Sequence, residues 1–404
     1  MKQTFLLIPV LAFTLLTSSC NNETNPENGD FISENIDFAA QQTKLQTDII
    51  EKEAGTVLFP KTYIDGEIRY TPREGWASGF FPGSIWYIYE LTGDEQWKDL
   101  AEKYTLALDS VKYLTSHHDV GFMIGSSFGN GLRLTGNESW KDVIVQAAKS
   151  LSTRYRPGAG VIQSWDADRG WQGERGWECP VIVDNMMNLE LLFNATRYSG
   201  DSAFYNIAVS HADKTMEHQY RPDYSCWHVI DYSLADGSVR NRHTAQGYSH
   251  ESAWSRGLAW GIYGFVMTYR ETGDEKYLNH AEKAFEFVAS HPDLPSDGIP
   301  YWDLDAPDIP DAYRDASSAA IIASALYELS GYVKAEYYKG WADKIMYSLG
   351  SPEYRANPGE NGNFILKHSV GSIPHNQEID VPLSYADYYF LEALKRKRDI
   401  ETGR

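Results

Sequence analysis

The chain has 404 residues and a net charge of −20, and 14% of its residues are aromatic, with 12 Trp and 27 Tyr. The negative charge argues against a nucleic-acid partner, because phosphates require a basic surface. It also means that an acidic ligand must be bound by a local cation, since the overall field repels it. The aromatic content fits either a large aromatic core or a cleft in which sugar rings stack on aromatic faces.

Residues 1–20 resemble a bacterial lipoprotein signal. Lys2 supplies a positive charge, a short apolar run follows, and small residues lead to Cys20. We expect lipidation of Cys20, a flexible polar tether over residues 21–33, and a location in the cell envelope, in the periplasm or at the outer membrane. An ordinary secretory signal with an incidental cysteine is the alternative. The body has no second apolar span, so the lipid is the one membrane contact that the sequence predicts.

Residues 34–404 repeat one pattern, a helical hairpin. In each repeat an apolar helix ends at a glycine in a left-handed C-cap, and usually an Asp or Asn beside it caps an amphipathic helix. Six such hairpins predict an all-α fold, a double-layered (α/α)6-barrel with a buried inner ring. A superhelical solenoid is the alternative, although its repeats are more evenly spaced. The turn glycines are Gly93, Gly136, Gly200, Gly273 and Gly331.

The predicted helices alternate between the outer and the inner layer. They cover residues 34–54, 78–92, 95–115, 121–135, 138–154, 183–199, 202–218, 254–272, 275–291, 316–330, 333–349 and 383–397. Long loops precede the inner helices and therefore gather at one end of the barrel, and loops of this length are usually functional. These loops cover residues 56–76, 156–182, 219–253, 292–315 and 350–382.

Two clusters in the first half of the chain contain candidate site residues. Trp76 and Phe80 lie four residues apart, so they share a helix face and form either a sugar platform or a packing contact of the loop. Asp119 precedes an apolar helix, where an Asp is usually an N-cap but can also be a functional carboxylate. We expect the adjacent His117 and His118 to point apart, and no third ligand accompanies them, so we predict no metal site.

Asp184 begins an otherwise apolar inner helix, among Val and Met residues. Apolar surroundings disfavour a charged carboxylate, so this group can hold a proton at neutral pH and donate it as a general acid. An N-cap is the alternative role. Arg256 and Trp260 lie one turn apart on a later inner helix, and a buried Arg needs an anionic partner. That partner is either a substrate carboxylate or a structural Asp or Glu.

Other patterns limit the enzyme class. The chain has no GxSxG, Walker, Rossmann or HExxH motif, which removes the common hydrolase, nucleotide and zinc-peptidase classes, and we predict no cofactor. A disulfide between Cys179 and Cys226 stays open, although two distant cysteines make no framework. In the last loop, Ser369, Ser372 and His375 are either plain loop residues or contacts for a sulfate or N-acetyl group.

Taken together, these segments resemble glycoside hydrolase family 88, the unsaturated glucuronyl hydrolases, over about residues 36–397. The resemblance implies an (α/α)6-barrel and the hydrolysis of a terminal 4,5-unsaturated glucuronic acid from lyase-generated fragments of chondroitin, hyaluronan or heparin. The matching motifs, in the family's order, are Trp76–Gly83, His118–Phe122, Val183–Asn188, Gln246–Ser249, Trp254–Trp260, Tyr301–Asp303, Arg314–Ala319 and Tyr385–Leu394.

The resemblance also implies roles for single residues. Asp184 matches the general acid/base of the family, and Asp119 matches its second essential carboxylate. Ala245 is a departure, because the family often has His there, and this puts the exact substrate preference in doubt. Substrate-contacting positions of the family are matched by Trp76, Phe80, His228, Gln246, Arg256 and Trp260. His228 alone would more often be a structural histidine.

The chemistry that the resemblance implies is hydration of the C4=C5 double bond. We expect Asp184 to give a proton to C4 and water to attack C5, after which the hemiketal opens and releases the next sugar. Three alternatives stay open: an unsaturated rhamnogalacturonyl hydrolase acting on pectin-lyase products, an ordinary inverting glycosidase, and a lipid-anchored glycan-binding protein.

Overall fold

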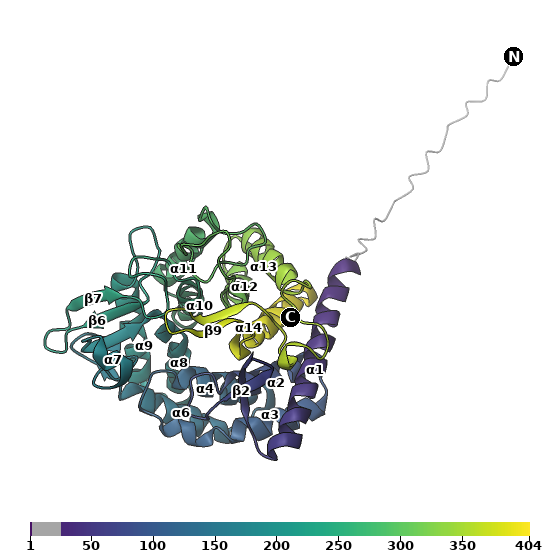
Figure 1. The fold of residues 1–404 in the computed structure, drawn as a ribbon, viewed down its shortest axis with the longest axis horizontal. Coiled ribbons are helices and arrows are strands. Elements are labelled where there is room, and N and C mark those ends of the chain that lie inside the picture. The colour runs from purple at the N-terminus through teal and green to yellow at the C-terminus, as the bar shows by residue number, and fades with distance from the viewer. Residues whose placement is uncertain (2–25) are drawn as a thin grey trace.

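The computed structural model describes residue 1 and residues 26–404, so the predicted signal segment and its Cys20 lie outside the described residues. The chain forms an (α/α)6-barrel, with a ring of inner helices inside a ring of outer helices (Figure 1). The outer ring contains α1 (Pro26–Ala54), α3 (Glu95–Leu106), α6 (Ser139–Ser152), α9 (Ser202–His218), α11 (Glu275–Ser290) and α13 (Ala335–Leu349). The inner ring contains α2 (Phe80–Thr92), α4 (Val120–Ile124) continued by α5 (Asn130–Thr135), α8 (Leu189–Ser199), α10 (Ser255–Thr272), α12 (Ala316–Ser330) and α14 (Ser384–Thr402).

The two rings follow from the hydrophobic pattern of their helices. In α10 every residue from Ser255 to Thr268 is buried, because an inner helix packs against the lumen on one side and against the outer ring on the other. The outer helix α11 buries only one stripe, which includes Tyr277, Ala281, Ala284 and Val288. A helix that is apolar all round requires burial on all sides, and an amphipathic helix requires it on one, so the double layer satisfies both kinds.

The predicted turn chemistry is confirmed in four of the five repeats. Gly93, Gly136, Gly200 and Gly273 adopt the left-handed conformation at the ends of inner helices. The following Asp caps the next helix in three of these turns, as in the bond from the Ala203 backbone N–H to Asp201 at 2.9 Å. Gly331 was wrongly predicted: its φ is −73°, and Lys334 takes the left-handed position at φ 44°. Three residues separate this glycine from α13, so the chain reverses its direction later in this turn, at Lys334.

Several predicted boundaries were also wrong. Helix α1 begins at Pro26, so residues 26–33 of the predicted tether, which covered 21–33, belong to this helix. Phe31 packs edge-on against Tyr347 of α13 with ring centroids 4.7 Å apart, and this contact extends the helix toward the N-terminus. The predicted helix over 183–199 starts as a 3-10 turn, Val183–Asn188, before α8. The helix over 95–115 ends at Leu106, before a separate 3-10 turn, Asp109–Tyr113.

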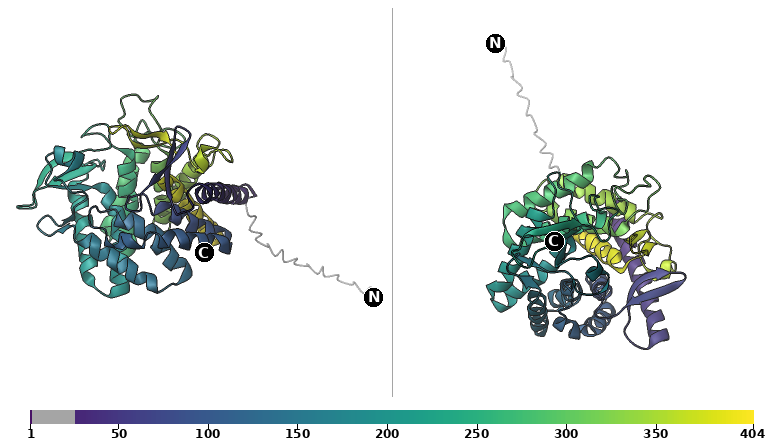
Figure 2. Two further views of the ribbon diagram at one scale, coloured as in Figure 1. Left: turned by 60° about the horizontal axis from the view of Figure 1, so that its bottom comes forward. Right: turned by 60° about the vertical axis from the view of Figure 1, so that its left-hand side comes forward.

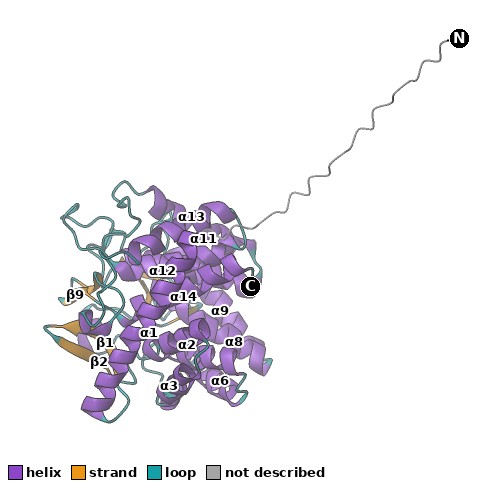
Figure 3. Cartoon of the chain, turned by 90° about the vertical axis from the view of Figure 1, so that its right-hand side faces the viewer, coloured by secondary structure: helices purple, strands orange, loops and turns teal. Residues whose placement is uncertain are grey.

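The long loops gather at one end of the barrel, as predicted, and contain short antiparallel strands that the sequence did not reveal (Figures 2 and 3). A short helix, α7 (Gly170–Glu174), lies in the same group of loops. The strands pair as β1 (Phe59–Ile64) with β2 (Glu67–Thr71), β3 (Tyr155–Arg156) with β4 (Val161–Ile162), β5 (Cys179–Ile182) with β6 (Val229–Tyr232) and β7 (Val239–His243), and β8 (Ser369–Ser372) with β9 (Gln377–Val381). This loop-covered end is where the candidate site residues meet.

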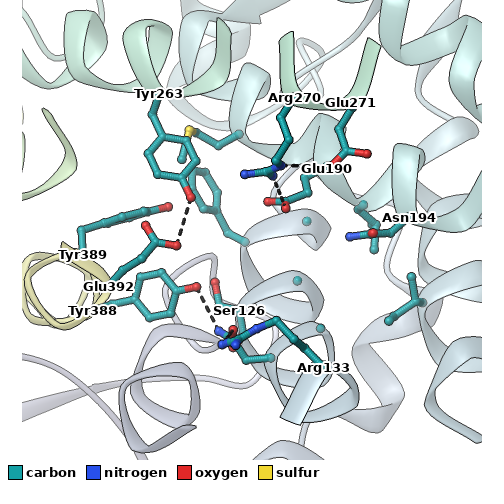
Figure 4. Close-up of a pocket in the computed structure, with 18 of the residues that line it drawn as sticks. Ser126, Arg133, Glu190, Asn194, Tyr263, Arg270, Glu271, Tyr388, Tyr389 and Glu392 are labelled. Atoms are coloured by element: carbon teal, nitrogen blue, oxygen red, sulfur yellow. Dashed lines mark hydrogen bonds and ion pairs between the residues drawn. The ribbon is translucent and has the colours of Figure 1, made fainter. Parts of the chain in front are cut away.

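The opposite end of the lumen is a cavity of about 560 Å³ whose charged side chains are paired with one another (Figure 4). Arg270 donates to both Glu328 oxygens at 2.9 Å and to Glu190 at 2.5 Å. Glu392 accepts from the hydroxyl groups of Tyr87 at 2.7 Å and Tyr263 at 3.0 Å. These contacts connect α2, α8, α10, α12 and α14, so they join the inner ring at the end remote from the long loops.

The barrel contains two cysteines, whose pairing the sequence did not decide. Cys179 and Cys226 are both free and buried, so they do not form a disulfide with each other. Burial raises the pKa of each thiol to about 12, which keeps both unreactive at neutral pH. Within residues 26–404, no helix combines the length and the apolar composition needed to cross a bilayer.

Candidate active site

The segments that contain Asp119 and Asp184 are in direct contact. Gly121, two residues after Asp119, packs against Asn188 so closely that a Cβ atom at Gly121 would lie 2.6 Å from the Asn188 Cα. The Phe122 backbone N–H donates to the Asn188 Oδ1 at 2.9 Å. The start of α4 is therefore held against the Val183–Asn188 turn, and both carboxylates lie at the same end of the lumen.

Asp119 is enclosed by two histidines and does not act as an N-cap. Its Oδ2 lies 2.9 Å from the His117 Nδ1 and its Oδ1 lies 3.2 Å from the His118 Nε2. Its side chain makes no hydrogen bond to the backbone N–H groups of α4. The prediction that the two histidines point apart was wrong, because the turn before α4 wraps both rings around one carboxylate. Within the described chain, no three His, Cys, Asp or Glu side chains are grouped so that they could hold a metal ion.

The His117 ring lies between the Glu74 backbone and the Asp119 carboxylate. Its Nε2 lies 3.0 Å from the Glu74 carbonyl oxygen and its Nδ1 faces a carboxylate, and both of these atoms can only accept. The Asp119 backbone N–H also approaches the His117 Nδ1, at 3.3 Å. When His117 is protonated, its two ring N–H groups can donate to the Glu74 carbonyl oxygen and to the Asp119 carboxylate. Burial lowers the pKa of His117, but the hydrogen bond to Asp119, the charge of Asp119 and the hydrogen bond to the Glu74 carbonyl together outweigh burial, so the net pKa is raised.

Asp119 is held in its ionised form by the same arrangement. Burial tends to raise the pKa of this carboxyl, but the charges of His118 and His117 and the hydrogen bond from His117 outweigh burial, so the net pKa is lowered. His118 itself has a lowered pKa, chiefly because it is fully buried, although the charges of Asp119 and Asp184 oppose that shift. Asp184 thus lies close enough to His118 to influence its titration, and the three groups form one electrostatic unit.

Asp184 has a different environment from Asp119. It is buried on the Val183–Asn188 turn, and its Oδ2 has no hydrogen-bond partner among the described residues. The His228 Nε2 lies 3.5 Å from that oxygen. The His228 Nδ1 accepts from the backbone N–H groups of Ala245 at 3.1 Å and Gln246 at 3.3 Å. Because Nδ1 is an acceptor, neutral His228 has its proton on Nε2, and this N–H faces Asp184.

An aromatic layer lies beneath the carboxylates. Trp76 lines a cavity of about 410 Å³ together with His117, Asp119 and Trp165, as expected for a sugar platform. Phe80 and Trp260 are predicted substrate contacts, but both have 0% exposed surface and lie within the core. Their rings surround Phe122, at 5.5 Å and 5.1 Å, and Trp76 packs on the same Phe122 at 5.7 Å. Phe80 and Trp260 thus support the platform from below.

Arg256 has the structural partner that the sequence left as an alternative. Its Nη1 lies 3.3 Å from the Asp315 Oδ2 and also donates to the Val370 carbonyl, and its Nη2 donates to the Gly371 carbonyl at 2.6 Å. Gln246 donates to the same Gly371 carbonyl at 3.0 Å. Both side chains therefore hold strand β8 over the site, and the guanidinium is already satisfied by protein groups.

Strand β8 contains the two predicted serines. Ser369 is fully buried at its start, and its hydroxyl has no hydrogen-bond partner among the residues that the structure describes. The Ser372 hydroxyl lies 2.7 Å from the His375 Nδ1. The His375 ring packs on Trp171 with ring centroids 4.9 Å apart, so the β8–β9 hairpin contacts the loop around α7.

Sequence reasoning missed the tryptophans of that loop. Trp165 packs against Trp171 at 5.1 Å and against Trp177 at 6.1 Å, and its ring lies 6.3 Å from His228. Three Trp within thirteen residues of one loop are a signal that could have identified this wall, because clustered aromatic residues outside a helical pattern often line saccharide clefts.

Comparisons with known proteins agree with this arrangement. The family model described as Glycosyl Hydrolase Family 88 matches residues 49–403. A protein of Formosa agariphila named unsaturated glucuronyl hydrolase is 43% identical over 403 residues, which cover 99% of each chain. A Streptococcus pneumoniae protein named unsaturated chondroitin disaccharide hydrolase is 30% identical, over 90% of this chain and 91% of its own.

A solved structure gives the same result for the fold. It is described as an unsaturated glucuronyl hydrolase specific for heparin, and it is 43% identical to this chain. It superposes with a TM-score of 0.87 over 92% of this chain and 98% of its own.

Proposed function

The chain belongs to glycoside hydrolase family 88, and from this premise we propose that it removes the terminal unsaturated glucuronic acid from oligosaccharides that glycosaminoglycan lyases release. The observation that supports this function best is the pair of buried carboxylates, Asp119 and Asp184, next to the Trp76 platform. A C4=C5 double bond needs a proton donor at one carbon and water at the other, and this pair is suited to those tasks.

The two carboxylates have different roles in this proposal. The histidines hold Asp119 ionised, so Asp119 is a poor proton donor at neutral pH. The role of acid therefore falls to Asp184, whose Oδ2 makes no hydrogen bond to another described group and lies 3.5 Å from the His228 Nε2. Asp119, fixed between His117 and His118, accepts hydrogen bonds from substrate hydroxyls.

The reaction then proceeds as hydration of an enol ether. Asp184 transfers its proton to C4, and positive charge develops at C5 and the ring oxygen. Water attacks C5 and gives its proton to the Asp184 carboxylate, which restores the acid. The resulting hemiketal opens, the bond to the next sugar breaks, and that sugar leaves with its hydroxyl group. One carboxylate thus acts as acid and base in turn.

We expect the protein to remove the ultraviolet absorbance of the conjugated alkene from unsaturated disaccharides. Heparin-derived disaccharides should react fastest, because the 43% identical solved structure is described as specific for heparin, whereas the relative named for chondroitin is 30% identical. The measurement is the initial rate of absorbance loss on heparin, hyaluronan and chondroitin disaccharides. Turnover only of pectin-lyase products would instead support an unsaturated rhamnogalacturonyl hydrolase.

We also propose that Cys20 is lipidated and anchors the enzyme in the cell envelope, which rests on the sequence of residues 1–20. Lipidated protein should incorporate a labelled fatty acid and sediment with membranes. Cys20→Ala should lose the label and move to the soluble fraction, because the protein then lacks its acyl chain. Cys226→Ala serves as the matched control, since this thiol is buried in the barrel. Membrane association of unlabelled Cys20→Ala protein would contradict the anchor.

A further inference from the structure

Arg175 stands out among the cations around the site. It lies between α7 and β5, with its guanidinium 5.8 Å from the Trp171 ring and 5.6 Å from the Trp177 ring. Across residues 26–404, no carboxylate lies within ion-pair distance of Arg175. Arg154 and Arg169, by contrast, share Asp166. An exposed cation without a carboxylate partner, in a chain of net charge −20, is available to an external anion.

Two histidines accompany Arg175 in the same wall. The His243 Nδ1 accepts from the Trp177 indole N–H at 2.9 Å, so neutral His243 has its proton on Nε2 as a free donor. His375 packs on Trp171, with its Nδ1 next to the Ser372 hydroxyl. Burial lowers the pKa of both histidines, and the positive charge of Arg175 contributes to each shift. Arg175 thus lies within electrostatic reach of both rings.

This wall continues from the reaction centre. His228 faces Asp184 at 3.5 Å, Trp165 packs edge-on against His228, and Trp171 packs on Trp165. Arg175 lies over the rings of Trp171 and Trp177. A saccharide whose terminal sugar reacts at Asp184 can therefore place its next sugar along Trp165, with the substituents of that sugar toward Arg175.

We propose that Arg175, with His243 and His375, binds a sulfate ester on the sugar next to the unsaturated uronate. This inference rests on the proposed function and deepens it, since it names sulfated disaccharides as the preferred substrate class. A sulfate ester is anionic at every physiological pH, and a guanidinium donates two parallel hydrogen bonds to such an oxyanion. The uronate carboxylate belongs to the reacting sugar and lies nearer to Asp184, so it is the less suitable partner for Arg175.

The test compares unsaturated heparin disaccharides with and without a 6-O-sulfate on the glucosamine. Arg175→Ala should lower kcat/KM on the sulfated substrate about tenfold, mainly through KM, because it removes a charge-assisted contact. The unsulfated substrate should change by less than about twofold. Arg175→Lys should keep part of the preference, since it retains the charge but loses the planar fork.

Arg242→Ala is the matched control. Arg242 is also an exposed guanidinium over a tryptophan, 4.9 Å from the Trp227 ring, but it is adjacent to His243 on β7 and therefore points to the opposite face. Arg242→Ala should leave kcat/KM on both substrates unchanged. If Arg175→Ala lowers kcat/KM equally on both substrates, or on neither, Arg175 does not bind the sulfate and the proposal is wrong.

Binding measurements separate this proposal from the proposed function. Calorimetry with Asp184→Asn protein reports affinity for the two disaccharides without turnover. The subsite requires tighter binding of the sulfated one, and this advantage must disappear when Arg175→Ala is added. Wild-type protein that binds both disaccharides but consumes neither would contradict the proposed reaction. The difference in affinity between the two disaccharides would then still decide whether Arg175 binds the sulfate.

Discussion

Asp184→Asn is expected to lower kcat about a thousandfold or more on unsaturated disaccharides, because the amide cannot give a proton to C4. The substitution is nearly isosteric and removes only the acid function. The Asp184 Oδ2 makes no hydrogen bond within the described structure. It lies 3.5 Å from the His228 Nε2, and the Oδ1 of asparagine can make the same contact. Substrate affinity, measured by calorimetry, should stay within about tenfold of the wild-type value. The rate is followed through the loss of alkene absorbance.

The matched control is the same change at a remote position. Asp201→Asn alters a helix cap, where the side chain accepts from the Ala203 backbone N–H, and asparagine caps equally well. Its turnover should equal that of the wild type within about twofold. Asp184→Asn protein that unfolds at the wild-type temperature yet turns over within tenfold of the wild-type rate would show that another group supplies the proton.

The layered fold was predictable because its signals are local. A helix that is apolar on all faces, a glycine, an Asp cap and an amphipathic helix each follow from neighbouring residues, and their repetition defines the barrel. The strands of the long loops were not predictable. Pairs as short as β3 (Tyr155–Arg156) with β4 (Val161–Ile162) carry little periodicity, and they form where tertiary contacts fix the loop.

Within the site, the sequence identified residues but not their partners. An Asp before a helix is usually an N-cap, so Asp119 and Asp184 were identified mainly because they match the essential carboxylates of the family that the sequence resembles. The partner of Arg256 is Asp315, 59 positions further along the chain, and only the packing of α10 beside α12 brings the two together. Phe80, to which the resemblance gives a substrate role, is completely buried, and a four-residue spacing cannot tell which face of a helix meets the lumen.

The barrel and the loops at its end have different functions in the site. The inner helices and their turns fix Asp119 and Asp184, while the loops add the Trp165 wall and the β8–β9 hairpin. Arg256 and Gln246 attach the hairpin to the barrel through the Gly371 carbonyl. The reaction centre thus rests on rigid elements, whereas the residues proposed to select the substrate lie on loops, which tolerate sequence change better than a packed core.

Asp119→Asn is expected to lower kcat/KM about a hundredfold or more, through loss of position and charge. In asparagine an NH₂ group replaces one of the two carboxylate oxygens that accept from His117 and His118. On that side the NH₂ group faces the N–H of a histidine, and two donors cannot form a hydrogen bond. The same change removes the interaction that raises the pKa of His117, and burial then lowers that pKa below its ordinary value of about 6.5. NMR of ring-labelled histidines measures this shift directly.

The direction in which activity changes with pH follows from the pair of His117 and Asp119. In the wild type the raised pKa of His117 means that its ion pair with Asp119 is complete below about pH 6.5 and is lost as the pH rises through the raised value. Activity should therefore decline on the alkaline side, and in Asp119→Asn the decline should occur at lower pH. His280 is the internal control, because burial sets its pKa at about 4 far from Asp119, and it should not move. An unchanged titration of His117 in Asp119→Asn would mean that its proton is held by the Glu74 carbonyl alone, and the role of Asp119 would then reduce to substrate contact.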